Sequence, residues 1–146
     1  MNGSNGEISK PADKKKDLGP PLKILVADDT AVNLALATKL LKRRGHEITS
    51  VEDGLQAFET FKKASFDVVL MDIHMPVMDG LESTAKIREF EASQPSRPPT
   101  PIIAMTANAM NGDEQKCYEA GMDGYISKPI RPAGLIDAIK NTVSQT

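Results

Sequence analysis

The sequence predicts an α/β fold built on a doubly wound parallel sheet, with helices on both faces. Short apolar runs alternate five times along the chain with segments of helical periodicity. The runs show no alternation of apolar and polar side chains, which is typical of strands that are buried on both faces. Because parallel strands need right-handed crossovers, strictly alternating strands and helices indicate a doubly wound sheet.

The expected strands are the apolar runs at residues 24–27, 48–51, 68–71, 102–105 and 125–126. The expected helices cover residues 32–41, 57–64, 81–90, 113–120 and 135–143. In the first of these, Val32, Leu36 and Leu40 share the predicted apolar face, with Ala37 and Leu41 beside them. Glycines 45 and 121 stand where helices end, and proline 132 suits the first turn of the last helix.

Composition bounds the class of protein. The chain has 146 residues, of which 40% are hydrophobic and 26% charged, and its formal net charge is −2. These values suit one ordinary domain and disfavour a nucleic-acid-binding surface. A single cysteine, Cys117, excludes an internal disulfide framework and suits a reducing compartment, so we expect a cytoplasmic location. The sequence contains no run of about 18 apolar residues, so it predicts no membrane-spanning helix.

The first 21 residues differ from the rest of the chain. They are rich in glycine, proline and lysine and contain few large aliphatic residues. Such a segment buries too little surface to offset the entropy of ordering it. We therefore expect residues 1–21 to form a flexible tail or linker and residues 22–146 to form the folded domain.

Polar residues stand at the carboxyl ends of four expected strands. The first strand is expected to end in Asp28 and Asp29, the third in Asp72, the fourth in Thr106 and the fifth in Lys128. In doubly wound sheets, ligands bind beyond the carboxyl ends of the strands. We therefore expect these five side chains to converge on one edge of the sheet.

The expected cluster has a recognisable chemistry. Two like unit charges 4 Å apart repel by about 4 kcal/mol at an effective dielectric constant near 20. Lys128 offsets one carboxylate, and a hard divalent cation with few protein ligands, Mg²⁺, would offset the others. A carboxylate held beside Mg²⁺, with an ammonium and a hydroxyl nearby, is equipped to attack phosphorus.

Four separated motifs resemble those of one family. They read ILVADD at 24–29, LMDIHMPVMDG at 70–80, PIIAMTA at 101–107 and GYISKP at 124–129. With them, residues 22–143 resemble a response-regulator receiver domain of two-component phosphorelay signalling, most like the receivers of hybrid sensor histidine kinases. The resemblance implies a five-stranded (βα)5 flavodoxin-like fold with strand order 2-1-3-4-5.

The resemblance also implies a phosphoacceptor and a metal site. Asp72 would take the phosphoryl group from a phosphohistidine. The Mg²⁺ ligands would be Asp28, Asp29, Asp72 and the backbone carbonyl of His74. The donor would be a histidine kinase or a histidine-phosphotransfer domain, and this domain would neither bind nucleic acid nor insert into a membrane. The chain would then be a signalling module rather than an enzyme.

Further roles follow from the resemblance. The phosphoryl group would contact Thr106, Ala107 and Lys128, and the switch residues would be Thr106 and Tyr125. His74 and Asn108 occupy positions that tune hydrolysis in the family. The Lys128–Pro129 peptide bond would be cis, which only a bond to proline tolerates easily.

Other interpretations remain open at this point. Asp28 and Asp29 would also suit the N-terminus of the next helix, and Tyr125 could simply pack with its hydroxyl at a wet edge. The chain could be a receiver that docks without taking phosphate. A haloacid-dehalogenase-type phosphatase would need an acid two residues after its nucleophile, where Asp72 is followed by His74. A nucleotide- or flavin-binding protein would need a glycine- or hydroxyl-rich first loop instead of an acidic one.

Overall fold

A computed structural model describes residues 20–94, 96–107 and 112–143. Within them five strands alternate with five helices. The strands are β1 (Lys23–Ala27), β2 (Glu47–Val51), β3 (Val68–Asp72), β4 (Ile102–Thr106) and β5 (Gly124–Ser127). The helices are α2 (Ala31–Arg43), α3 (Gly54–Lys63), α4 (Gly80–Ala92), α5 (Asp113–Ala120) and α6 (Pro132–Val143). Most of the predicted tail (residues 1–19) and Asn108 lie outside the described residues.

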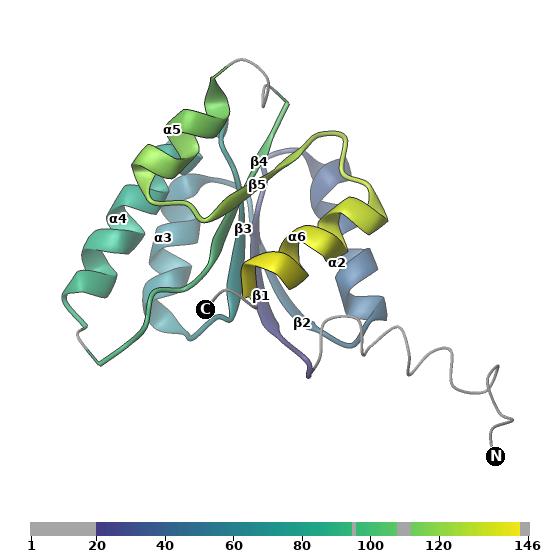
Figure 1. Cartoon of the computed structure of the whole chain (residues 1–146), viewed down its shortest axis with the longest axis horizontal. Helices are drawn as coiled ribbons and strands as arrows, with labels where there is room; N and C mark the ends of the chain where they lie inside the picture. Colours follow the sequence, from purple (N-terminus) through teal and green to yellow (C-terminus); the bar gives the residue numbers. More distant parts are fainter. Residues whose placement is uncertain (1–19, 95, 108–111, 144–146) are drawn as a thin grey trace, which may run out of the picture.

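The strands form one parallel sheet in the order β2-β1-β3-β4-β5. This confirms the predicted doubly wound fold and its strand order. Figure 1 shows α2 and α6 on one side of the sheet and α3, α4 and α5 on the other. No helix among the described residues combines the length and the apolar character that crossing a bilayer requires.

Each side of the sheet has its own hydrophobic core. Side chains of β1, β3 and β4 alternate between the two faces, so Leu25 packs toward α3 and α4, and Ile24 packs toward α2 and α6. Phe61 is the largest fully buried side chain and contacts the rings of Phe66 and Phe90. The central strands are buried throughout, so their polar ends emerge only at the edge of the sheet.

The predicted apolar face of α2 is only partly confirmed, because Val32 and Leu36 lie outside the buried side that holds Ala37, Leu40 and Leu41. Val32 and Leu36 are 75% and 40% exposed, whereas Ala37 and Leu41 are fully buried. Leu34 and Leu40 complete the buried side. Residues 34, 37 and 41 follow the three- and four-residue spacing of a helix face equally well, and apolar spacing alone does not tell which stripe the sheet covers. Val32 and Leu36 therefore form an exposed apolar pair one turn apart.

Several boundaries shift by one to three residues. The fifth strand ends at Ser127, so Lys128 is the first residue beyond it and not its last. Gly45 and Gly121 have φ values of +93° and +106°, a left-handed conformation that glycine adopts at helix ends. Pro132 is the first residue of α6, as predicted.

We predict that Gly80→Ala lowers the free energy of unfolding by about 2–3 kcal/mol. A Cβ atom at Gly80 would lie 2.1 Å from the backbone oxygen of Asp72, so the start of α4 would have to move away from β3. Gly134→Ala in α6 is the matched control, since a Cβ there meets nothing within 4 Å. Urea unfolding should show Gly134→Ala unchanged or slightly more stable, and equal stability of the two variants would contradict the predicted clash.

Candidate functional site

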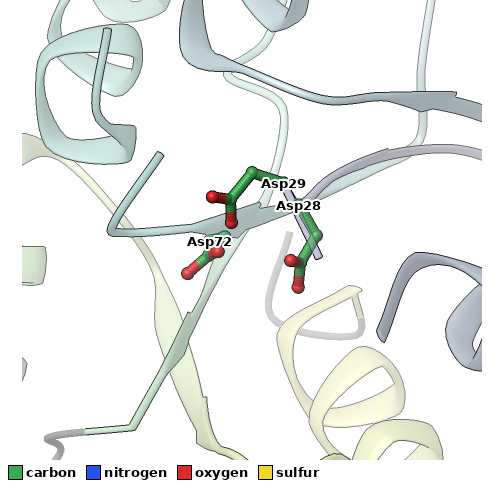
Figure 2. A group of neighbouring side chains, drawn as sticks. All are labelled: Asp28, Asp29 and Asp72. Atoms are coloured by element: carbon green, nitrogen blue, oxygen red, sulfur yellow. The ribbon is translucent and has the colours of Figure 1, made fainter. Parts of the chain in front are cut away.

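Three carboxylates meet at the carboxyl edge of the sheet. Asp28 and Asp29 follow β1, and Asp72 ends the neighbouring strand β3 (Figure 2). One carboxylate oxygen from each lies within 4.8 Å of the other two. Asp28 and Asp72 are buried, at 0% and 3% exposure, while Asp29 is exposed. The register of two parallel strands therefore brings together acids that are 44 residues apart.

Lys128 links the two buried acids. Its Nζ atom lies 3.2 Å from Asp28 Oδ2 and 3.1 Å from Asp72 Oδ2. The Lys128–Pro129 peptide bond is cis, and Ile130 beyond it is buried in the core on the α2 and α6 side. The four charged groups expected at this edge thus lie together.

Each buried acid also accepts a hydrogen bond from an amide two residues later. Asp28 Oδ1 accepts from the Thr30 N–H at 2.8 Å, and Asp72 Oδ1 accepts from the His74 N–H at 3.3 Å. Thr30 is the residue that precedes α2, so the bond from Asp28 goes to the residue before the helix and does not cap the amides of its first turn. Asp28 Oδ2 is buried and, within the described residues, has an ammonium beside it but no hydrogen-bond donor of suitable geometry.

The electrostatics of this cluster favour added positive charge. Burial raises the pKa of Asp72 to about 6, and the charge of Asp28 adds to the rise, while Lys128 and the His74 amide oppose it. Burial alone lowers the pKa of Lys128, but its contacts with Asp72 and Asp28 outweigh burial and raise it. The ammonium therefore stays protonated, and one lysine does not fully compensate the acids.

The segment between β3 and α4 closes tightly around Asp72. The Gly80 N–H donates to the Ile73 carbonyl at 2.8 Å, and Asp79 caps α4 by accepting from the Glu82 N–H. Val77 lies at the turn with φ +69° and is 77% exposed. This segment fixes the His74 amide beside the acid and leaves the His74 side chain 67% exposed.

Thr106 lies beside this cluster and is 1% exposed. It ends β4, one residue after Met105, which pairs with Asp72. Its hydroxyl donates to Asp113 Oδ2 at 2.8 Å, and His74 Nε2 lies 3.7 Å from the same oxygen. Asp113 was expected only as the start of a helix. The single signal in the sequence was an acid seven residues after a strand-end hydroxyl.

Tyr125 and Ala107 occupy different surroundings. Tyr125 is half-buried on β5 and packs edge-on against the ring of Tyr118 at 6.5 Å. The charge of Glu114 and a hydrogen bond to its side chain raise the pKa of the Tyr125 hydroxyl. Ala107 is exposed just beyond β4.

A doubly wound (βα)5 sheet with an acid trio and a lysine at its carboxyl edge is the arrangement of receiver domains. The chain belongs to the family described as "Response regulator receiver domain", which matches residues 24–140. It is thus a signalling domain of two-component phosphorelays, of the kind found in hybrid histidine kinases. The sequence-based family prediction is confirmed.

Two relatives illustrate this context. Hybrid signal transduction histidine kinase I of Dictyostelium discoideum is 44% identical over 128 residues, which cover 84% of this chain and 7% of that protein. Sensor protein GacS of Pseudomonas syringae pv. syringae is 38% identical over 138 residues, covering 91% of this chain and 15% of that protein. The chain therefore spans only a small part of the length of these relatives.

Two solved structures share the fold. The receiver domain of the sensor histidine kinase PA1611 of Pseudomonas aeruginosa, described with a magnesium ion in its active-site cleft, has a TM-score of 0.76 and 35% identity, covering 86% of this chain and 99% of that one. The receiver domain of Ssk1 from Saccharomyces cerevisiae was crystallised with the histidine phosphotransfer protein Ypd1. It has a TM-score of 0.82 and 25% identity, covering 86% of this chain and 91% of that one.

We predict that Asp72→Asn stabilises the fold above pH 7 in the absence of divalent cations. The pKa of Asp72 rises from 3.8 to about 6 on folding, so the native state prefers the protonated acid. Ionised Asp72 therefore destabilises the native state above about pH 6, and this destabilisation disappears as the pH falls toward 3.8. A neutral amide should add about 1–3 kcal/mol to the free energy of unfolding at pH 8 and little at pH 4.

Urea unfolding with EDTA at both pH values measures this difference. Asp137→Asn, at an exposed position on α6, is the matched control and should add nothing at either pH. If the Asp72→Asn variant is less stable than the wild type at pH 8, ionised Asp72 does not destabilise the native state and the prediction is contradicted.

Proposed function

We propose that the chain accepts a phosphoryl group on Asp72 from a phosphohistidine and changes its partner binding in response. The observation that carries this proposal is the buried Asp72 carboxylate, whose Oδ2 lies 3.1 Å from the Lys128 ammonium. With a pKa of about 6, the carboxylate is largely ionised at neutral pH and can act as a nucleophile. Receiver-family membership supports the same role.

The donor set suits Mg²⁺. Three carboxylates within 4.8 Å of one another provide hard oxygen ligands, and within the described residues Asp28 Oδ2 has the Lys128 ammonium beside it but no hydrogen bond of suitable geometry. The residues that would hold the ion are Asp28, Asp29, Asp72 and, through its backbone carbonyl, His74. When bound, Mg²⁺ would neutralise negative charge on the phosphoryl oxygens. The magnesium ion of the related Pseudomonas aeruginosa receiver supports this assignment.

The transfer step conserves charge and atoms. An Asp72 carboxylate oxygen forms a bond to phosphorus while the phosphorus–nitrogen bond of the phosphohistidine breaks. The imidazole nitrogen keeps the electron pair of that bond, and a proton from solvent water completes the neutral imidazole. Lys128 stays protonated because of its two carboxylate neighbours, and it is close enough to Asp72 to pair with the incoming phosphoryl oxygens.

The remaining residues would hold or read the phosphoryl group. Thr106 and Ala107 follow β4 beside Asp72 and would donate from a hydroxyl and a backbone amide. Tyr125 would report the change at the surface. Hydrolysis, in which water attacks the phosphorus and restores the carboxylate, would be tuned by His74, whose side chain is exposed, and by Asn108. In this proposal residues 22–146 form the receiver and residues 1–21 a linker.

The partner would be a histidine kinase or a histidine-phosphotransfer domain. Val32 and Leu36 expose apolar surface on α2, the helix that begins two residues after Asp29. A hollow of about 510 Å³, lined by Asp28, Asp29 and residues of α2, opens beside the acids. An exposed apolar pair next to a reactive pocket suits docking of a protein donor. The yeast complex of a receiver with Ypd1 supports this class of partner.

A receiver that only docks is the second candidate. It would keep the same fold and the same exposed α2 surface while Asp72 stayed unmodified. The raised pKa of Asp72 and its contact with Lys128 favour the phosphoacceptor, because a docking surface needs no strained buried acid. A phosphatase is disfavoured by His74 at the position that would need an acid.

We predict that acetyl phosphate with Mg²⁺ adds one phosphoryl group to the wild-type chain. Asp72→Asn should abolish the addition, because an amide oxygen is a poor nucleophile. Asp28→Asn should slow it, since one oxygen ligand becomes neutral. Intact-mass spectrometry measures the labelling. Asp137→Asn is the control and should be labelled like the wild type. If the wild-type chain itself is not labelled, the phosphoacceptor proposal fails and the receiver that only docks becomes the better candidate.

We predict that Val32→Asp slows phosphoryl transfer from a phosphorylated histidine-phosphotransfer protein about tenfold, which corresponds to about 1.4 kcal/mol. Leu55→Asp on α3 is the matched control, because Leu55 is 40% exposed but lies on the other side of the sheet. Transfer from phosphorylated Ypd1 can be followed by the loss of label from the donor. Equal slowing by both variants would argue against docking on α2.

A further inference from the structure

Asp113 is a buried acid that the proposed phosphoryl chemistry does not use. It is 8% exposed, and it begins α5, where its charge favours the helix N-terminus. Its Oδ2 accepts a hydrogen bond from the Thr106 hydroxyl, with 2.8 Å between the two oxygens, and this bond is buried. The bond ties the end of β4 directly to the first turn of α5.

We propose that Asp113 is a positioning residue that holds the Thr106 hydroxyl in the unphosphorylated state, and that an incoming phosphoryl group must compete with it. This inference rests on the proposed function of Asp72. A hydroxyl has one proton to donate, so Thr106 cannot donate to Asp113 and to a phosphoryl oxygen at once. Phosphorylation then requires the Thr106–Asp113 bond to break.

Breaking this bond alters the surroundings of Asp113. A buried carboxylate that loses its donor is destabilised until it finds another. His74 Nε2 lies 3.7 Å from the same oxygen, and the His74 side chain is largely exposed and free to approach. Asp113 can therefore exchange a partner on β4 for one on the segment after β3, and this exchange displaces the start of α5.

The displaced helix leads to Tyr125. The next residue of α5, Glu114, is hydrogen-bonded to the Tyr125 hydroxyl, and Tyr118, one turn later, packs against its ring. Movement at Asp113 is thereby passed to both contacts of Tyr125. A hydrogen-bond exchange in the interior becomes a change on the surface of α5 and β5.

The chain offers a clean optical readout. It has no tryptophan, and its two tyrosines are the contacting pair Tyr118 and Tyr125. Tyrosine fluorescence therefore reports this surface alone. Titration of the chain with beryllofluoride, a phosphoryl mimic, in the presence of Mg²⁺ gives a half-saturating concentration for each variant.

Asp113→Ala should lower the half-saturating beryllofluoride concentration about tenfold, because the Thr106 hydroxyl no longer has a charged competitor. Asp113→Asn should lower the half-saturating concentration less, since the amide oxygen can still accept a hydrogen bond from the Thr106 hydroxyl. Glu119→Gln is the matched control: it removes an acid from the same helix, and Glu119 accepts an exposed hydrogen bond from Gln115. It should match the wild type.

A double-mutant cycle separates this mechanism from simple removal of negative charge. In a Thr106→Val background, Asp113→Ala should have no effect, because the competition requires the hydroxyl. If Asp113→Ala lowers the half-saturating beryllofluoride concentration as much in that background as in the wild type, the proposal is overturned. The same holds if Asp113→Ala alone leaves this concentration unchanged. The Thr106 hydroxyl proton offers a second measurement: NMR should detect it in slow exchange in the wild type and lose it in Asp113→Ala.

The outcome also distinguishes the two proposals. If the wild type binds beryllofluoride and Asp72→Asn does not, the phosphoacceptor function stands, and the Asp113 variants alone decide this inference. If the wild type fails to bind beryllofluoride, both proposals fall together.

Discussion

The burial of Asp28 and Asp72 side by side on two paired strands is the constraint on which the site depends. Both carboxylates are buried, and the parallel register of β1 and β3 holds them next to each other. Lys128 reaches both from the end of β5, but burial still raises the pKa of Asp72 to about 6. A pocket held in this state attracts positive charge, and in the proposed function a bound cation would then attract the phosphoryl anion.

The scaffold around the acids explains why the strain persists. The central strands are fully buried, so moving Asp72 would disturb the sheet and both cores. Gly80 lets α4 begin directly against the Asp72 carbonyl, and Gly54 does the same for α3 against the Met78 carbonyl. The Ser83 hydroxyl closes this junction by donating to the Gly54 carbonyl. Tight packing on three sides keeps the unfavourable charges in place.

The fold and the acid cluster could be predicted because their signals are local. Continuous apolar runs mark strands buried on both faces, and polar residues at their carboxyl ends must meet at one edge. The exposed face of α2 could not be predicted. Val32 with Leu36 and Leu34 with Ala37 both fit helical spacing, and only packing against the sheet decides which pair is buried. Asp113 was missed for a related reason: an acid that opens a helix is common, and its bond to Thr106 depends on how β4 and α5 turn toward each other.

The position of Thr106 connects the strained pocket with the surface. Its backbone belongs to β4, which pairs with β3 and β5 in the sheet, whereas its hydroxyl is held by the first residue of α5. In the proposed mechanism, a ligand at the acids would therefore act on α5 while the sheet stays in place. The contacts of Tyr125 with Glu114 and Tyr118 join that same helix to β5, where Tyr125 lies. In the proposed exchange the sheet stays fixed while α5 adjusts, so a local charge event would have two discrete outcomes.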